Sequence, residues 1–149
     1  MIFNVVDNKK NLDNYYIVGQ VDANLADFVN FKYTGTIFAA PGVIKHIKKR
    51  HSHELNKRFL DDLISTIKVI IESPDYIGSH PKKKGTGIEF IKKLDTNFLV
   101  GVEVDLDDNY IYVATMYPIV QAKIDSRLNS GRLKKYSNLE GNDDVALTE

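Results

Sequence analysis

Two histidines and four cations stand close together in residues 42–51 of this chain. The histidines are His46 and His51, and the cations are Lys45, Lys48, Lys49 and Arg50. Histidine is the side chain whose ordinary pKa lets it both accept and donate a proton near neutral pH. A histidine pair among cations therefore predicts acid/base chemistry on an anion such as a phosphate.

In a helix, the two histidines would lie on different faces. At about 100° per residue, His46 shares a face with Arg50 and His53, whereas His51 lies on the apolar stripe with Ile44 and Ile47. The sequence favours His46 as the residue that transfers a proton and Arg50 as the residue that binds the charge of the substrate. His51 is either the partner of His46 or a structural histidine, and a solvated basic helix face is the alternative for the whole run.

A second group of polar residues lies in the last third of the chain. Hydroxyls at a predicted strand end precede a cationic segment, and the group comprises Thr115, Tyr117, Lys123, Arg127, Ser130 and Arg132. These side chains could bind the same anion as His46. The run Lys82-Lys83-Lys84 lies near glycines without Walker spacing, which indicates a basic loop that touches phosphates. Tyr76, Tyr112 and Tyr117 either stack on bases or pack within a sheet.

Composition limits the classes of chemistry. The chain has no cysteine, which excludes disulfides, thiolate nucleophiles and cysteine-type zinc sites. The two histidines lie five residues apart without an intervening glutamate, so the pattern predicts no metal and no cofactor. Lys and Arg balance Asp and Glu at 20 each, but they are segregated along the chain. With no apparent signal or membrane segment, we expect a cytoplasmic protein that does not bind membranes.

The elements that must position these residues follow from apolar periodicity and turn residues. We expect a β-rich N-terminal flank over 1–40, with short strands at 3–6, 15–18 and 36–39. A basic helix over 43–51 and a core helix over 54–72 follow. An exposed loop is expected over 76–87, then an antiparallel meander of strands over 87–94, 98–106 and 110–119, a helix over 121–132 and an acidic tail over 137–149. Helices followed by a meander indicate the α+β class in one domain.

Four blocks of the chain together resemble the phage-type barnase-EndoU-colicin-RelE-like (BECR) nuclease domains. They are Ile44-Lys45-His46-Ile47-Lys48-Lys49-Arg50-His51, Pro74-Asp75-Tyr76-Ile77-Gly78, Tyr112-Val113-Ala114-Thr115-Met116-Tyr117, and the segment 123–134 with Ser130-Gly131-Arg132-Leu133-Lys134. The similarity covers about residues 37–135. It implies an α+β fold in which helices precede a four-stranded antiparallel sheet, placed here at residues 41–136.

The resemblance also implies an activity and a set of residues. The activity is metal-independent cleavage of RNA by an endonuclease of phage, mobile-element or toxin type, with RNA and a cognate inhibitor or antitoxin as partners. The catalytic residues would be His46, His51, Arg50, Thr115, Tyr117, Lys123 and Arg127. Substrate would be bound by Lys49, Tyr76, Lys83, Ser130, Arg132 and Lys134. The alternative is a non-catalytic module of the same fold that binds RNA or a protein. A third possibility is a DNA-directed nuclease or DNA binder, and the oligomeric state is left open.

Overall fold

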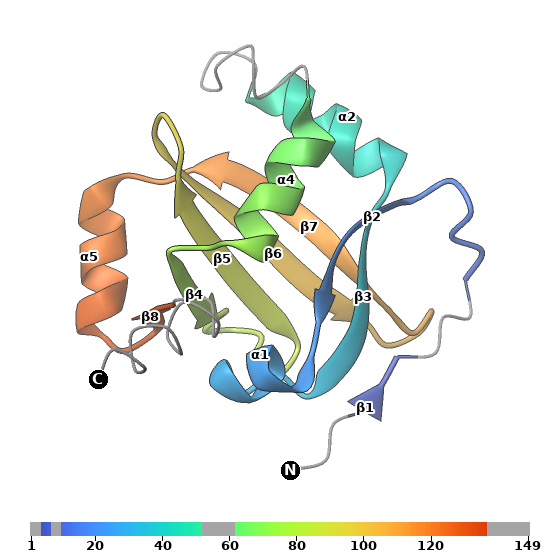
Figure 1. The fold of residues 1–149 in the computed structure, drawn as a ribbon, viewed down its shortest axis with the longest axis horizontal. Coiled ribbons are helices and arrows are strands. Elements are labelled where there is room, and N and C mark those ends of the chain that lie inside the picture. The colour runs from blue at the N-terminus through green and yellow to red at the C-terminus, as the bar shows by residue number, and fades with distance from the viewer. Residues whose placement is uncertain (1–3, 7–9, 52–61, 137–149) are drawn as a thin grey trace, which may run out of the picture.

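A curled, mixed β-sheet organises the chain in the computed structural model, which describes residues 4–6, 10–51 and 62–136 (Figure 1). The strands are β1 (Asn4–Val5), β2 (Tyr16–Val21), β3 (Tyr33–Ala39), β4 (Tyr76–Ser79), β5 (Gly87–Lys93), β6 (Asn97–Asp105), β7 (Tyr110–Pro118) and β8 (Leu133–Lys135). The helices are α1 (Ala23–Phe28), α2 (Pro41–Arg50), α4 (Leu63–Glu72) and α5 (Gln121–Asn129). The strand order is β1-β3-β7-β6-β5-β4-β8, and β2 also pairs with β3.

The expected four-stranded antiparallel sheet is wrong, although the class is α+β. Among the described residues the sheet has eight strands, and β3 pairs in parallel with both β1 and β7. The N-terminal strands therefore extend the sheet through β3. The expected loop after residue 76 begins with β4, and the last predicted helix ends early, at Asn129, so that β8 can pair with β4.

Local sequence explains the elements that were predicted well. Pro41 begins α2, where a proline costs no helical hydrogen bond. Asp62 caps α4 by accepting a hydrogen bond from the Ser65 backbone N–H at 3.3 Å. Between β6 and β7, the Asp105 carboxylate accepts from the N–H groups of Asp107 and Asp108, and Asn109 takes a left-handed φ of 57°. Residues 54–61 of the predicted core helix, like His53 and the acidic tail, lie outside the described residues.

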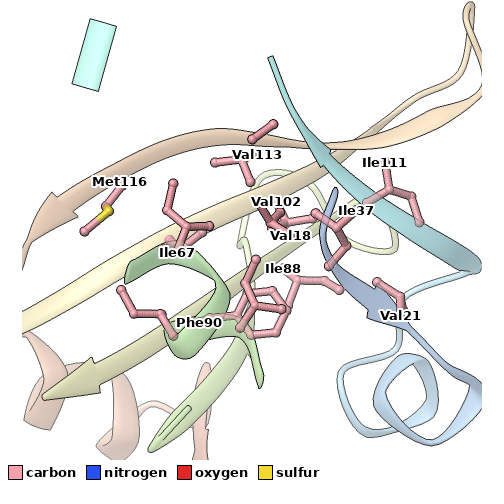
Figure 2. Close-up of a cluster of buried hydrophobic side chains, with 14 of the residues drawn as sticks. Val18, Val21, Ile37, Ile67, Ile88, Phe90, Val102, Ile111, Val113 and Met116 are labelled. Carbon is pink, nitrogen blue, oxygen red and sulfur yellow. The ribbon is translucent and has the colours of Figure 1, made fainter. Parts of the chain in front are cut away.

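The main hydrophobic core lies between one face of the sheet and helix α4. Figure 2 shows Ile67 of α4 above Ile88 and Phe90 of β5, with Val102 and Val113 from the next two strands beside them. All five side chains are at most 2% exposed. Because side chains alternate along a strand, packing Ile88 and Phe90 here directs Glu89 and Ile91 to the opposite face.

Helix α5 covers only one end of that opposite face (Figure 1). A second, smaller hydrophobic cluster forms beneath it, and its buried members are Ile91, Leu99, Ile119, Ile124 and Leu133. Tyr76 and Tyr117 pack against this cluster. Further along the strands, the same face carries the polar side chains described next.

Candidate active site

A buried carboxylate is the centre of the polar face. Glu89 lies in the middle of β5 and is only 4% exposed. Its Oε1 atom accepts hydrogen bonds from Arg132 Nη2 at 2.8 Å and from Arg127 Nη1 at 3.3 Å. No described residue donates a hydrogen bond to the other carboxylate oxygen, Oε2. Two guanidinium groups thus balance one buried charge and leave one of its oxygens for another partner.

Glycines on both neighbouring strands make room for this carboxylate. In the sheet register, Glu89 pairs with Gly78 of β4 on one side and with Gly101 of β6 on the other. A glycine inside a strand removes a side chain and lets other groups approach the backbone closely. Gly101 in turn pairs with Thr115 of β7, whose side chain is exposed. A Cβ atom at residue 101 would lie 3.0 Å from Thr115 Cγ2, so the Thr115 side chain packs over Gly101.

The turn after α5 positions the second arginine. The Ser130 hydroxyl donates to the Arg127 carbonyl oxygen at 3.0 Å, and the Arg132 backbone N–H donates to Ser130 Oγ at 3.4 Å. Gly131 takes a φ of +80°, a left-handed conformation that glycine adopts without strain. The chain then reverses into β8, so that Arg127 and Arg132 reach Glu89 from a helix and from a turn.

Replacement of Gly78 by alanine is expected to displace this turn. A Cβ atom at residue 78 would lie against the Arg132 carbonyl oxygen, which is backbone and cannot rotate away. Overpacking of this kind costs about 1–3 kcal/mol. Gly42 is the matched control, because a Cβ there meets nothing within 4 Å, and alanine inside a helix is favoured. Urea unfolding should show Gly78→Ala destabilised and Gly42→Ala unchanged or stabilised; equal midpoints for the two variants would contradict the close approach.

A second carboxylate lies on the same face. Glu103 of β6 pairs with Gly87, two residues along β5 from Glu89, a diagonal separation of about 7–8 Å between backbones. Its Oε1 accepts from the Tyr112 hydroxyl at 3.2 Å, and its Oε2 lies 2.8 Å from Lys83 Nζ. Burial, followed by the nearby Glu103 charge, raises the pKa of Tyr112 to about 12. The Tyr112 phenol therefore keeps its proton at neutral pH.

The structure brings some of the predicted site residues together on this face. Arg127 and Arg132 bind Glu89, Lys83 binds Glu103, and Thr115 stands across Gly101. The remaining residues of this part of the chain have other places. Tyr76 and Tyr117 pack beneath α5, Lys123 is exposed one turn before Arg127, Ser130 holds the turn, and Lys134 Nζ donates to the Phe28 carbonyl oxygen at 3.4 Å.

The basic helix is placed differently. Helix α2 packs through the buried Ile44 and Ile47, and His46, Lys49 and Arg50 lie exposed on its other sides. None of these three has a hydrogen bond or an ion pair from its side chain to a described residue. His51 is half-buried at the C-cap, where its backbone N–H donates to the Ile47 carbonyl oxygen. No contact within the described residues joins His46 to the Glu89 centre, and its catalytic role stays a prediction.

Sequence reasoning missed both carboxylates of the centre. Glu89 stands alone among apolar neighbours in the strand run Gly87-Ile88-Glu89-Phe90-Ile91. A charge enclosed by apolar residues within a strand needs a counter-charge, because burying it unpaired is costly. That signal, together with the glycine at residue 101, could have identified the centre.

The described residues contain no group of three or more His, Cys, Asp or Glu side chains that could hold a metal ion. None of the helices in the described ranges combines the length and the apolar character needed to cross a bilayer.

The sheet face thus carries two carboxylates, three cations and two hydroxyl groups, with two arginines on Glu89 and a tyrosine and a lysine on Glu103. Cations beside a carboxylate are groups that could bind a phosphate and accept a proton. A family model described as phage-Barnase-EndoU-ColicinE5/D-RelE like nuclease3 (PBECR3) matches residues 16–126. The chain belongs to this nuclease family. No curated protein and no solved structure matches the chain.

The match supports the resemblance that the four sequence blocks indicated. It spans β2 to the middle of α5, and so includes Glu89, Glu103, Tyr112 and Thr115. Arg127 and Arg132, the two arginines that bind Glu89, both lie beyond the matched residues. Membership assigns the protein to the nucleases in general.

Proposed function

We propose that this protein is an RNA endonuclease that cleaves by transesterification at the Glu89 centre. The observation that carries the proposal is the Glu89 carboxylate, buried on the polar face of the sheet and bound on one oxygen by Arg127 and Arg132. Membership of a nuclease family supports an action on phosphodiesters. The choice of RNA, with its 2′-hydroxyl as the nucleophile, follows from the resemblance to the BECR nuclease domains.

In the proposed reaction, Glu89 Oε2 accepts the proton of a ribose 2′-hydroxyl. The 2′-oxygen forms a bond to the adjacent phosphorus, and the bond from phosphorus to the 5′-oxygen breaks. The products are a 2′,3′-cyclic phosphate and, after the leaving oxygen takes up a proton, a 5′-hydroxyl. Arg127 and Arg132 stabilise the charge that develops on the phosphoryl oxygens, which is commonly the largest single contribution to the rate.

The leaving oxygen has two candidate proton donors. Tyr112 carries a phenolic proton on the same face as Glu89 and is oriented by Glu103. His46, the leading acid/base predicted from the sequence, is exposed on α2, which packs against β7. Thr115 and Lys83 are then placed to bind the substrate. An inhibitor protein and a cytoplasmic location remain predictions from the sequence.

The experiment that tests the function uses mixed cellular RNA in excess chelator. We expect fragments that carry 2′,3′-cyclic phosphate and 5′-hydroxyl ends. An RNA with a single 2′-deoxynucleotide at a mapped cleavage site should resist cleavage there, because it lacks the nucleophile. A requirement for divalent cations, or cleavage of the deoxy substrate, would contradict transesterification. RNA that is bound but left intact would favour a non-catalytic module.

The same assay separates the two proton donors. With Tyr112 as the donor, Tyr112→Phe loses activity and His46→Ala retains it. With His46 as the donor, the effects of the two substitutions are reversed. Urea unfolding of both variants shows whether a loss of activity comes from a loss of folding.

A further inference from the structure

An open pocket lies beside the Glu89 centre, on the far side of Arg132. It has a volume of about 520 Å³ and is lined by residues 28–30 and 32, 77–79, 81, 84–85, 131–132 and 134. Four of the lining residues are cations, namely Lys32, Lys84, Arg132 and Lys134, and none is acidic. Arg132 belongs to both places, because its guanidinium group binds Glu89 while the residue lines the pocket.

Contacts between distant segments fix the walls of the pocket. The Ser79 hydroxyl donates to the Val29 carbonyl oxygen at 2.6 Å, which joins β4 to the end of α1. The Lys32 backbone N–H donates to the Gly85 carbonyl oxygen at 3.1 Å. Gly85 takes a φ of +82°, and a Cβ atom there would lie 3.1–3.2 Å from the Lys32 side chain. The aliphatic part of the Lys32 side chain therefore packs against Gly85, and a larger residue at position 85 would be strained. Contacts between distant segments of the fold thus hold the walls of the pocket in place.

The charges of the pocket are only partly compensated. Glu89 neutralises Arg132, and Lys134 Nζ lies 5.3 Å from the centre of the Phe28 ring and donates to the Phe28 carbonyl oxygen. Lys32 and Lys84 have no ion pair with any described residue. A pocket with two uncompensated lysines, a third held on an aromatic ring and no acid selects an anion. Phe28, Val29 and Pro81 give the same pocket an apolar wall.

We propose that this pocket is a subsite for one phosphate-bearing nucleotide of the RNA strand, next to the two nucleotides whose scissile phosphodiester lies over Glu89. The inference rests on the proposed function and extends it by placing the path of the strand from the sheet face across Arg132 to the edge of β4. The volume is within the range of small-ligand pockets, the lysines match the phosphate, and the apolar wall matches a base or sugar. A free nucleotide has the same chemistry, so the experiment must separate it from a strand.

The test compares two double variants that remove equal charge. Lys32→Gln/Lys84→Gln removes the uncompensated cations of the pocket. Lys68→Gln/Lys93→Gln is the matched control, because both side chains are exposed on other elements and have no ion pair with a described residue. Binding of a 2′-O-methyl RNA octanucleotide, which lacks the nucleophile, is followed by fluorescence anisotropy over a range of salt concentrations. A 2′-O-methyl dinucleotide and adenosine monophosphate are the short probes.

The pocket variant is expected to bind the octanucleotide about 10-fold more weakly than the parent. Its plot of log affinity against log salt should be shallower by about 0.7, the slope of one phosphate contact in a single strand. The dinucleotide can occupy the Glu89 centre alone, so its affinity should change little. Thermal midpoints of both double variants report folding, and single Lys84→Gln repeats the comparison if the double variant is unstable.

Several outcomes would overturn the subsite. An equal loss in the control would indicate general electrostatics, an equal loss for the dinucleotide would indicate the Glu89 centre itself, and tighter binding of adenosine monophosphate than of the octanucleotide would indicate a free-nucleotide site. Failure of the proposed function would give a different result. If the parent protein cleaves no RNA but the pocket variant still binds the RNA strand more weakly than the parent, the subsite is supported and the nuclease mechanism is refuted. Cleavage without any effect of the pocket variant refutes the subsite alone.

Discussion

Replacement of Glu89 by glutamine is expected to lower RNA cleavage by about 10³-fold. Glutamine has nearly the same shape as glutamate, but its amide cannot accept the proton of the 2′-hydroxyl. Loss of a positioned general base typically costs 10²–10⁴ in rate. The loss should fall on kcat, because Arg127 and Arg132 remain to hold the phosphate. Single-turnover cleavage of a labelled RNA measures it directly.

The same substitution also carries a stability cost that must be separated from catalysis. Glu89 is buried and paired with two arginines, and removal of one partner of a buried ion pair costs about 3–5 kcal/mol. Glu89→Asp keeps the charge but withdraws the carboxylate by one methylene group. If Glu89 is the general base, the Glu89→Asp variant should lose most of its cleavage activity while its stability is largely retained. If the variant kept both its cleavage activity and its stability, Glu89 would have only a structural role.

Glu72→Gln is the matched control for the charge change. Glu72 is exposed at the end of α4, against the opposite face of the sheet. This variant should match the parent in both urea unfolding and cleavage. A comparable loss of cleavage in Glu72→Gln would indicate that any removed carboxylate has this effect, and would count against a special role for Glu89.

The strands that carry the centre were predictable because their signals are local. The predicted strands over 87–94, 98–106 and 110–119 agree closely with β5, β6 and β7, which are joined by short polar turns. Apolar alternation and turn residues such as Asn109 determine these hairpins within a few residues of chain. The basic helix over 43–51 likewise overlaps α2, which proline begins.

The rest of the sheet depends on contacts between distant segments. β3 pairs in parallel with β7 through only two residue pairs, Ile37 with Ile111 and Phe38 with Tyr112. β4 and β8 are four and three residues long and exist as a pair with each other. Segments this short carry little periodicity of their own, so no pattern in the sequence distinguishes them from loops. The four-stranded expectation failed for this reason.

The candidate site was predictable on its cationic side only. Arg127 and Arg132 stand out because they are concentrated in a basic segment, and the structure brings both to one carboxylate. Glu89 can be identified as a site residue only when the orientation of its strand is known. Its neighbours Ile88 and Phe90 pack in the core, so Glu89 lies on the other face of the sheet. His46 stood out by residue type, but the phase of α2 places it on an exposed face.

Arg132→Lys is expected to lower kcat by about 10²-fold with little change in KM. Lysine keeps the positive charge, so Glu89 stays neutralised and the substrate is still attracted. The ammonium group has no planar fork, however, and cannot bind Glu89 and a phosphoryl oxygen at the same time. Removal of one donor to a developing oxyanion costs about 10²–10³ in kcat. Steady-state kinetics on a defined oligonucleotide separate this from a loss of binding.

A double variant decides whether Arg132 acts on the substrate or only on Glu89. Arg132→Gln alone leaves the buried carboxylate with one arginine, whereas Glu89→Gln/Arg132→Gln removes both partners of the 2.8 Å ion pair. The stability losses should therefore be strongly non-additive, with the double variant more stable than the sum of the single losses implies. Cleavage should nevertheless stay at the level of the weaker single variant, because neither the base nor the phosphoryl donor has returned. If cleavage recovered together with stability, Glu89 and Arg132 would be a structural pair, and the catalytic groups would have to be sought among Glu103, Tyr112 and the residues of α2.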